Sequence, residues 1–368
     1  MRPLSIGLAG TRGIPARYGG FETFAEELSV RLAARGHRVT VYVRQHYACH
    51  PEAFYRGVEL QVLPAVRTKY LETVTHTFFS LLHAFWKRFD VLLICNGVNA
   101  WVAWLPRLRG TRTVLNVDGI ERRRRKWGAP GRWFYAVNER LATLTPTRVV
   151  TDAQVIHDYY LSRYGLATEC IPYGAPIGRE DSQDAVICRG LQAQQYFLYV
   201  SRLEPENNAH LVIEAYRASG VSEPLVVVGD APYSDRYKRH LRRLAEGLSV
   251  RFPGAVYGRE YRELLSHCRC YLHATEVGGT HPALLEAMGA GVPIIAHDTP
   301  ENREVVEGCG ILCDFRDREQ PAAWMRRAAA GTEIWSDLVL RAQERIRSVY
   351  DWERITNRYE ELFYDLVG

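Results

Sequence analysis

Residues 273–302, HATEVGGTHPALLEAMGAGVPIIAHDTPEN, combine residue types and a spacing that suit the binding of a diphosphate. Gly278, Gly279 and Thr280 have little or no side chain, so their backbone N–H groups can approach a ligand closely. Pro282 suits the first position of a helix, where its missing N–H costs nothing. Because the N-terminus of a helix behind such a turn attracts anions, the segment predicts a phosphate site.

Glu286 lies four residues after Pro282 and therefore on the same face of the predicted helix, one turn further on. A carboxylate there can accept hydrogen bonds from the two vicinal hydroxyls of a ribose. Gly291 is expected to end the helix, and Val292–Ala296 to form a buried strand. The alternative is a glycine turn that merely caps a helix of any α/β protein.

Arg202 follows the apolar run Tyr196–Ser201, at the carboxyl end of a predicted strand, where doubly wound sheets bind ligands. Its guanidinium can bridge two oxygens of a diphosphate. Arg202 could instead be an ordinary surface arginine. Tyr257 and Arg259 follow a further predicted strand and could stack on a nucleotide base, or simply pack within their loop.

Two candidates lie in the first half of the chain. Gly19 and Gly20 open a predicted helix and form a second turn that a ligand could approach closely, although an ordinary turn fits equally well. Asp118 follows the predicted strand Thr113–Val117 and could orient an acceptor hydroxyl or stabilise positive charge. Its alternative role is to cap the N-terminus of a helix.

A basic run with neighbouring tryptophans stands out from the mild net charge of +5. Such a run is usually a solvated face, and no nucleic-acid-reading motif accompanies it, so we expect no nucleic-acid partner. Basic residues interleaved with aromatics also suit an anionic membrane surface. The candidate membrane or acceptor residues are Arg123, Arg124, Arg125, Lys126 and Trp127.

The composition is that of an ordinary globular protein, with 47% hydrophobic and 24% charged residues in a chain of 368. We expect a cytoplasmic protein, either free or peripheral at the inner face of the plasma membrane, because neither a signal peptide nor a membrane-spanning apolar run is recognisable. The cysteines are scattered, and reduced core thiols are favoured over metal binding at Cys268/Cys270 or Cys309/Cys313. A His–Glu–His metal site around Glu276 is disfavoured in the same way.

Alternating strands and helices predict two doubly wound α/β halves. The predicted boundaries are residues 1–178, residues 190–350 and a C-terminal amphipathic helix within 351–368, with a polar linker at Glu180–Arg189. The predicted strands are Ser5–Ala9, Val39–Val43, Val91–Cys95, Thr113–Val117, Arg148–Thr151, Tyr196–Ser201, Leu225–Gly229, Val256–Gly258 and Cys270–Ala274.

These motifs resemble the donor site of retaining, family 4 glycosyltransferases with the GT-B fold. LLEAMGAGVPIIA matches the second half of the family pattern Glu-Gly-Phe-Gly-x-x-x-x-Glu-Ala, while Gly278 replaces its first Glu and Glu276 is the nearest acid. YVSRLEPENN is similar to Gly-Arg-Leu-x-x-Glu-Lys-Gly, with Asn207 in place of the Lys, and Asp118 stands where many relatives have a histidine. VGGTHPALLEAM and GTRGIPARYGGFET resemble a bacterial branch that includes β-1,4-rhamnosyltransferases.

The resemblance implies two Rossmann-like domains that face each other across a cleft, with the C-terminal helix crossing back onto the first. It also implies sugar transfer from a nucleoside diphosphate donor, first of all dTDP-L-rhamnose, to a saccharide or lipid-linked acceptor with retention. The leaving phosphate would accept the acceptor proton, so no protein nucleophile is needed. Asp118, Arg202 and Glu276 are the candidate catalytic residues, and the chain has no Asp-x-Asp. We therefore expect no metal and no other cofactor.

Other reactions remain open on the sequence alone. The same fold could use a UDP- or GDP-sugar, or catalyse epimerisation of a nucleotide sugar. A Rossmann oxidoreductase is disfavoured, because Gly10-Thr-Arg-Gly13 leads into a long loop and not directly into a helix.

Overall fold

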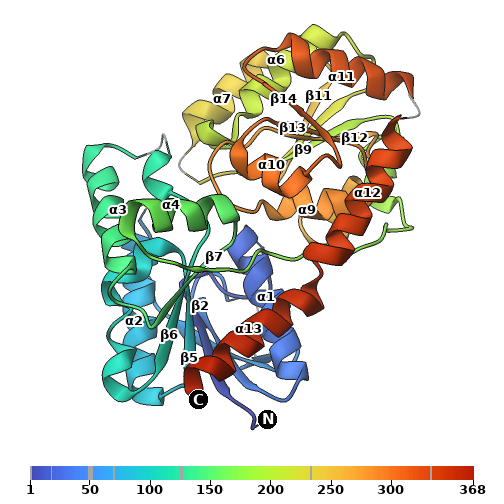
Figure 1. Cartoon of the computed structure of the whole chain (residues 1–368). Helices are drawn as coiled ribbons and strands as arrows, with labels where there is room; N and C mark the ends of the chain where they lie inside the picture. Colours follow the sequence, from blue (N-terminus) through green and yellow to red (C-terminus); the bar gives the residue numbers. More distant parts are fainter. Residues whose placement is uncertain are drawn as a thin grey trace. The chain divides into compact units, whose positions relative to one another are not determined.

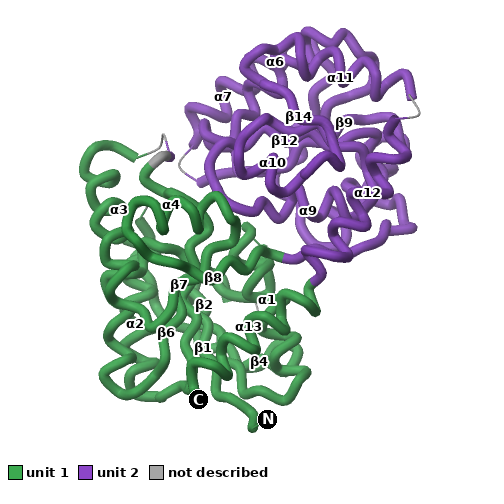
Figure 2. The backbone as a smooth tube through the Cα atoms, in the orientation of Figure 1, with its two compact units in different colours: residues 1–123, 127–173, 352–368 green, residues 124–126, 174–351 purple. Residues whose placement is uncertain are grey.

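The computed structural model describes residues 2–17, 19–48, 53–68, 71–124, 127–232, 234–331 and 334–368. It divides into two compact units, coloured separately in Figure 2. Unit 1 comprises residues 1–123, 127–173 and 352–368, and unit 2 comprises residues 124–126 and 174–351. Each unit is described by itself below.

Unit 1 is built on a sheet whose described strands run in the order β3-β4-β2-β1-β5-β6-β7-β8 (Figure 1). All neighbouring strands are parallel except β3 and β4. The strands are β1 (Ser5–Ala9), β2 (Arg38–Arg44), β3 (Phe54–Tyr55), β4 (Val58–Leu63), β5 (Val91–Cys95), β6 (Arg112–Val117), β7 (Arg148–Thr151) and β8 (Glu169–Cys170). The five strands predicted for this half are confirmed, and β3, β4 and β8 are additional.

The helices of unit 1 connect these strands in the alternating manner of a doubly wound sheet. They are α1 (Gly20–Ala34), α2 (Leu71–Lys87), α3 (Ala129–Ala142), α4 (Gln154–Tyr164) and α13 (Trp352–Val367), with 3-10 helices η1 (Gly97–Val102), η2 (Pro106–Arg109) and η3 (Glu121–Arg123). β5 is buried along its whole length, as expected for a central parallel strand covered on both faces.

The C-terminal helix α13 belongs to unit 1 although it follows the second half of the chain. It packs against α1, and Asn116 at the end of β6 donates a hydrogen bond to the hydroxyl of Tyr359 at 2.7 Å. Arg35, just after α1, forms ion pairs with Glu353 and Glu360 of α13, both at 2.6 Å. The amphipathic helix predicted for Asp351–Leu366 is thus present with nearly the predicted bounds.

Unit 2 contains a second sheet, whose described strands are all parallel and run in the order β11-β10-β9-β12-β13-β14. The strands are β9 (Phe197–Val200), β10 (Leu225–Val228), β11 (Val250–Gly254), β12 (Cys270–His273), β13 (Ile294–His297) and β14 (Ile311–Cys313). The prediction of a strand at Val256–Gly258 is wrong: the strand lies earlier, at β11, and Gly258 is the first residue of α8.

The helices of unit 2 are α5 (Asp184–Ile187), α6 (Ala209–Ser219), α7 (Asp235–Leu244), α8 (Gly258–Ser266), α9 (Pro282–Gly289), α10 (Pro300–Val306), α11 (Glu319–Ala330) and α12 (Ile334–Val349), with the 3-10 helix η4 (Pro205–Asn207). α5 lies within the segment predicted to be a linker. No described helix in either unit is long and apolar enough to span a bilayer.

Candidate functional site

The carboxyl ends of three adjacent strands of unit 2, β9, β12 and β13, hold the loop that follows β12. Asn208 donates from Nδ2 to the carbonyl oxygen of Ala274 at 2.9 Å, and Asn302 donates to that of Thr275 at 3.3 Å. The N–H of Glu276 donates to the carbonyl oxygen of Glu206 at 3.3 Å. Because Asn208 and Asn302 are buried, these bonds fix the backbone just before the glycine turn.

The turn and helix predicted at this loop are both present. Gly278, Gly279 and Thr280 lie buried directly before α9, whose first residue is Pro282. The carbonyl oxygen of His281 accepts the N–H groups of Leu284 and Leu285 and so starts the helix. The geometry is that of a turn followed by a helix N-terminus, which favours an anion.

Arg202 lies two residues after β9, at the same edge of the sheet. Its positive charge acts on the neighbouring His281. Burial, followed by the charges of Arg124 and Arg202, lowers the pKa of His281 to about 3, so the imidazole is neutral at physiological pH. The charge of Arg202 thus acts at His281, the residue directly before α9.

Asn207 does not supply the cation that the family motif has at its position. Its Nδ2 donates to the carbonyl oxygen of Arg202 at 2.6 Å, and its own carbonyl oxygen accepts the hydroxyl of Tyr199. Asn207 is also 4% exposed. Asn207 therefore stabilises the loop that contains Arg202.

Glu286 lies one turn into α9, and the hydroxyl of Tyr261 donates to its Oε2 at 2.6 Å. Tyr261 comes from α8, so two helices position the carboxylate. Burial, together with the negative charge of Glu286, raises the pKa of Tyr261 well above its usual value, so the phenol remains a donor. A carboxylate oriented in this way suits vicinal hydroxyl donors.

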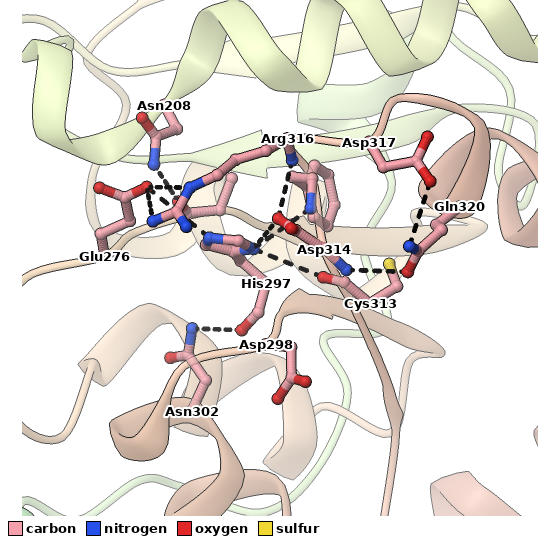
Figure 3. A network of polar contacts seen from close by, with 12 residues as sticks. Asn208, Glu276, His297, Asp298, Asn302, Cys313, Asp314, Arg316, Asp317 and Gln320 are labelled. Carbon is pink, nitrogen blue, oxygen red and sulfur yellow. Dashed lines mark hydrogen bonds and ion pairs between the residues drawn. The ribbon is translucent and has the colours of Figure 1, made fainter.

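Glu276 forms a polar network with the last residue of β13 and with side chains that follow β14 (Figure 3). Its Oε1 accepts hydrogen bonds from Arg316 at 3.0 Å and 3.3 Å and lies 3.7 Å from Nε2 of His297. The N–H of Phe315 donates to Nδ1 of His297 at 3.2 Å, which leaves the Nε2 side directed toward the carboxylate. Oδ1 of Asp314 lies 3.7 Å from Nδ1 of the same imidazole.

The two residues predicted to stack on a base lie near the start of α8. Tyr257 precedes that helix and is 44% exposed, which leaves its ring accessible. Arg259 pairs instead with Glu263 at 3.0 Å, and Glu263 also accepts the N–H of Ala185 at 2.7 Å. The side chain of Arg259 is 63% exposed, so this contact is an ion pair at the surface of α8.

In unit 1, Gly19 precedes α1 and Gly20 is its first residue, and the Gly19 carbonyl oxygen accepts the N–H groups of Glu22 and Thr23. Asp118 follows β6 and is partly exposed. Burial, together with the charge of Asp118, raises the pKa values of Cys95 and Tyr173. The charge of Asp118 thus acts on Cys95, the last residue of β5.

The basic run is only partly described: Arg125 and Lys126 lie outside the described residues, as does the side chain of Arg123. Arg124 is 4% exposed, and its guanidinium lies 3.8 Å from the buried Glu206 within unit 2. Trp127 packs against Tyr135, with ring centroids 5.0 Å apart. The described members of the run are therefore engaged within the protein.

The described cysteines are free thiols, and the described histidine, cysteine and acidic side chains form no cluster of three or more suited to a metal ion. The sequence predictions missed four residues that shape the site: Asn208, Tyr261, Asn302 and Arg316. Asn302 ends the segment first singled out, and its polarity after a buried strand was a usable signal. Nothing in the sequence pairs Tyr261 with Glu286 or Arg316 with Glu276.

Two family models match the two halves of the chain. Residues 19–174 match the "Glycosyl transferase 4-like domain", and residues 190–344 match "Glycosyl transferases group 1". O-antigen chain mannosyltransferase B of Escherichia coli is 24% identical over 171 residues, 45% of this chain and 44% of that protein. N-acetyl-alpha-D-glucosaminyl L-malate synthase of Bacillus anthracis is 24% identical over 182 residues, 48% of this chain and 47% of that protein. The chain thus spans about half the length of these curated relatives.

Solved structures resemble the chain over nearly its whole length. A sucrose-phosphate synthase from Thermosynechococcus elongatus has a TM-score of 0.81 at 20% identity, and 98% of each chain is covered. HepE of Anabaena in complex with UDP-glucose has a TM-score of 0.80 at 18% identity, covering 98% of this chain and 100% of that one. These neighbours share the fold, two Rossmann-like domains with parallel sheets. The second half of the chain thus belongs to the group 1 glycosyl transferases and the first half to the glycosyl transferase 4-like domains, and the fold is that of the GT-B glycosyltransferases.

Proposed function

We propose that this protein transfers a sugar from a nucleoside diphosphate donor to an acceptor hydroxyl with retention of anomeric configuration. The proposal is supported by the residues that lie at the carboxyl ends of the strands in the sheet of unit 2. There Arg202 follows β9, the Gly278–Thr280 turn follows the adjacent strand β12, and Glu286 lies in α9. A cation and backbone N–H groups suit the diphosphate, and the carboxylate suits the ribose.

In the proposed reaction the bond between the anomeric carbon and the donor phosphate oxygen breaks. A bond from the acceptor oxygen to the same carbon forms on the same face, and the acceptor proton passes to the departing phosphate. Catalysis then depends on stabilising the leaving diphosphate, the role we assign to Arg202 and the turn. Glu276 would contact the sugar, and Asp118 would orient the acceptor.

For the donor we propose dTDP-L-rhamnose first, because VGGTHPALLEAM resembles the rhamnosyltransferase branch of bacterial polysaccharide synthesis. UDP- and GDP-sugars are the alternatives, and HepE of Anabaena, which shares the fold, is complexed with UDP-glucose. The acceptor would be a saccharide or a lipid-linked glycan. Contact with a membrane through the basic run is less favoured, because Arg124 is buried and Arg122 pairs with Glu139 at 3.0 Å.

A thermal-shift screen tests the proposal, since a ligand that binds the folded state raises its melting temperature. The panel contains UDP, dTDP and GDP with their glucose, mannose and rhamnose conjugates. We expect at least one conjugate to stabilise the protein. Arg202→Ala should abolish the shift, whereas the control Arg341→Ala should preserve it, because Arg341 is exposed and pairs with Asp337 on α12.

Product analysis then identifies the reaction. Transfer to an acceptor with the anomeric configuration of the donor supports the proposal. An inverted product excludes retention, and an epimerised nucleotide sugar without transfer identifies an epimerase. A panel in which no nucleotide or conjugate stabilises the protein would overturn the proposal as a whole.

A further inference from the structure

Helix α2 of unit 1 exposes the side chains that a helix normally buries. Phe78, Phe79, Leu82 and Trp86 are 38%, 40%, 37% and 67% exposed, and together with Leu71 they follow one stripe of the helix. Single exposed apolar residues are ordinary, but a contiguous row of large ones marks a surface that contacts something else.

The opposite face of α2 is the more polar one, although it packs on the sheet. Its buried residues include His76, Thr77 and Ser80, each 0% exposed. Ser80 satisfies its hydroxyl within the helix by donating to the carbonyl oxygen of His76 at 2.8 Å. Leu81 and Ala84 are the apolar residues on this buried face, so α2 carries large apolar side chains on its exposed face in addition to those it buries, unlike an ordinary surface helix.

The 3-10 helices next to α2 extend this surface. The rings of Phe78 and Trp101 stack with centroids 6.1 Å apart, and the indole N–H of Trp104 donates to the carbonyl oxygen of Trp101 at 3.0 Å. Trp104 is 45% exposed and Leu108 67%. We define the aromatic face as the exposed residues of α2 and the two that follow it: Phe78, Phe79, Leu82, Trp86, Trp104 and Leu108.

The charge around the aromatic face is positive. Between residues 78 and 112 the chain has five lysine or arginine residues and one acidic residue, Asp90, which accepts hydrogen bonds from Arg2 and from the N–H of Ser5. Arg109 lies over the ring of Trp86, with Cζ 5.0 Å from the centroid. In the described part of the chain Lys87 pairs with Glu59, whereas Arg88, Arg107 and Arg109 form no ion pair. The guanidinium of Arg107 donates a hydrogen bond to the carbonyl oxygen of Thr145 at 2.6 Å, and its exposed charge is not neutralised by it.

We propose that the aromatic face docks this protein on an anionic lipid surface. Tryptophan and phenylalanine would enter the interface between headgroups and acyl chains, and Arg88, Arg107 and Arg109 would contact lipid phosphates. A second copy of the chain is the less suitable occupant, because a symmetric contact would bring two like-charged basic rims together. This surface lies wholly in unit 1 and is separate from the candidate donor site in unit 2.

Co-sedimentation with vesicles tests this proposal on the full chain. We expect binding to vesicles of phosphatidylcholine with phosphatidylglycerol, and at least tenfold weaker binding to phosphatidylcholine alone. The triple variant Phe79→Ser/Leu82→Ser/Trp86→Ser should bind anionic vesicles at least tenfold less. The matched control Ile187→Ser/Ile334→Ser/Leu340→Ser removes three apolar side chains of unit 2 that are at least as exposed, and it should bind as the wild type does.

The charge contribution is measured separately with Arg88→Gln/Arg109→Gln, which should weaken binding to anionic vesicles and leave binding to neutral vesicles unchanged. Equal binding by the wild type and the serine triple variant would overturn the proposal, as would a wild type that binds no vesicle. A wild type that dimerises through this face, and becomes monomeric in the triple variant without binding vesicles, would identify a second copy as the occupant. Thermal melting of each variant checks that its fold is retained.

Discussion

The imidazole of His281 occupies the space that a side chain on Gly278 would need. A Cβ added to Gly278 would lie 2.5 Å from Cε1 of His281 and 3.2 Å from its Nδ1. In the family pattern these two positions carry Glu and Gly, respectively. Both positions of the chain therefore differ from the family pattern together. Gly278 replaces the acidic residue, and the imidazole of His281, three residues later, fills the space that the acidic side chain would occupy.

This coupling predicts a specific pattern of stability. Gly278→Ala should destabilise the protein by about 1–3 kcal/mol, because the added methyl group must displace the imidazole. His281→Gly should remove the steric part of that penalty, while the strain from the positive φ of Gly278 remains, so the double variant should still be more stable than the sum of the single effects predicts. Chemical denaturation measures all three variants. Gly128→Ala is the control, since the nearest atom to its added Cβ is 4.0 Å away; additive effects at Gly278 and His281 would disprove the coupling.

Glu286 and Tyr261 give the second prediction. Glu286→Gln keeps the shape of the side chain but removes the charge-assisted acceptor, so every nucleotide should bind more weakly by about 1.5–3 kcal/mol. Tyr261→Phe should cause a smaller loss of the same kind, because the carboxylate loses the hydroxyl that orients it at 2.6 Å. Isothermal titration with dTDP, UDP and their sugar conjugates measures both. If the losses appear only with one attached sugar, Glu286 contacts the sugar and not the ribose.

Glu276 and Arg316 should act together on the sugar. Arg316 is 63% exposed, so the ion pair itself contributes less than about 1 kcal/mol to stability. Removing either residue should therefore leave the melting temperature nearly unchanged. Glu276→Gln and Arg316→Ala should each reduce the ratio of affinities for a nucleotide sugar and the matching nucleoside diphosphate. The double variant should lose no more than the single variants lose, and fully additive losses would show that Arg316 does not position Glu276.

Most of the fold was predictable because buried parallel strands appear in the sequence as short apolar runs. β5 is a continuous apolar run between Asp90 and Asn96, and β12 is a buried run that follows Arg269 and ends at His273; the predicted limits of both were accurate to one residue. Val256–Gly258 failed because β11 is an edge strand with alternating burial and contains Pro253, whereas the following loop contains the more apolar run. β3 and β8, of two residues each, are too short to leave a pattern.

The candidate site was predictable only in part. The turn before α9 and the position of Arg202 follow from local spacing, so the sequence was sufficient for both. The hydrogen bond from Asn208 to Ala274 spans 66 residues, and the contact of Arg316 with Glu276 spans 40. Such pairs form because their strands are neighbours in the sheet. The strand order β9-β12-β13-β14 cannot be predicted from any single segment of the sequence.

Metal ions should be dispensable for the reaction. The proposal assigns the charge of the leaving diphosphate to Arg202 and to backbone N–H groups at the start of α9, which need no bridging cation. Initial rates should therefore be the same with EDTA as with magnesium or manganese. Activity that disappears in EDTA and returns with either ion would contradict the role given to Arg202. It would also show that the lack of an Asp-x-Asp motif does not predict independence of metal ions.

Asp118 should affect catalysis without affecting donor affinity. It lies in unit 1, whereas Arg202, Glu276 and Glu286 all lie in unit 2. Asp118→Asn preserves the shape of the side chain and removes the charge that contributes, after burial, to the raised pKa of Cys95. If Asp118 orients the acceptor hydroxyl, kcat should fall by roughly 10²–10⁴-fold, the usual contribution of a positioned acid or base. The Kd for the donor should stay within about twofold, a difference of less than about 0.5 kcal/mol. An equal loss in donor affinity would instead identify Asp118 as a donor-binding residue. An unchanged kcat would favour the alternative role of Asp118, capping the N-terminus of a helix.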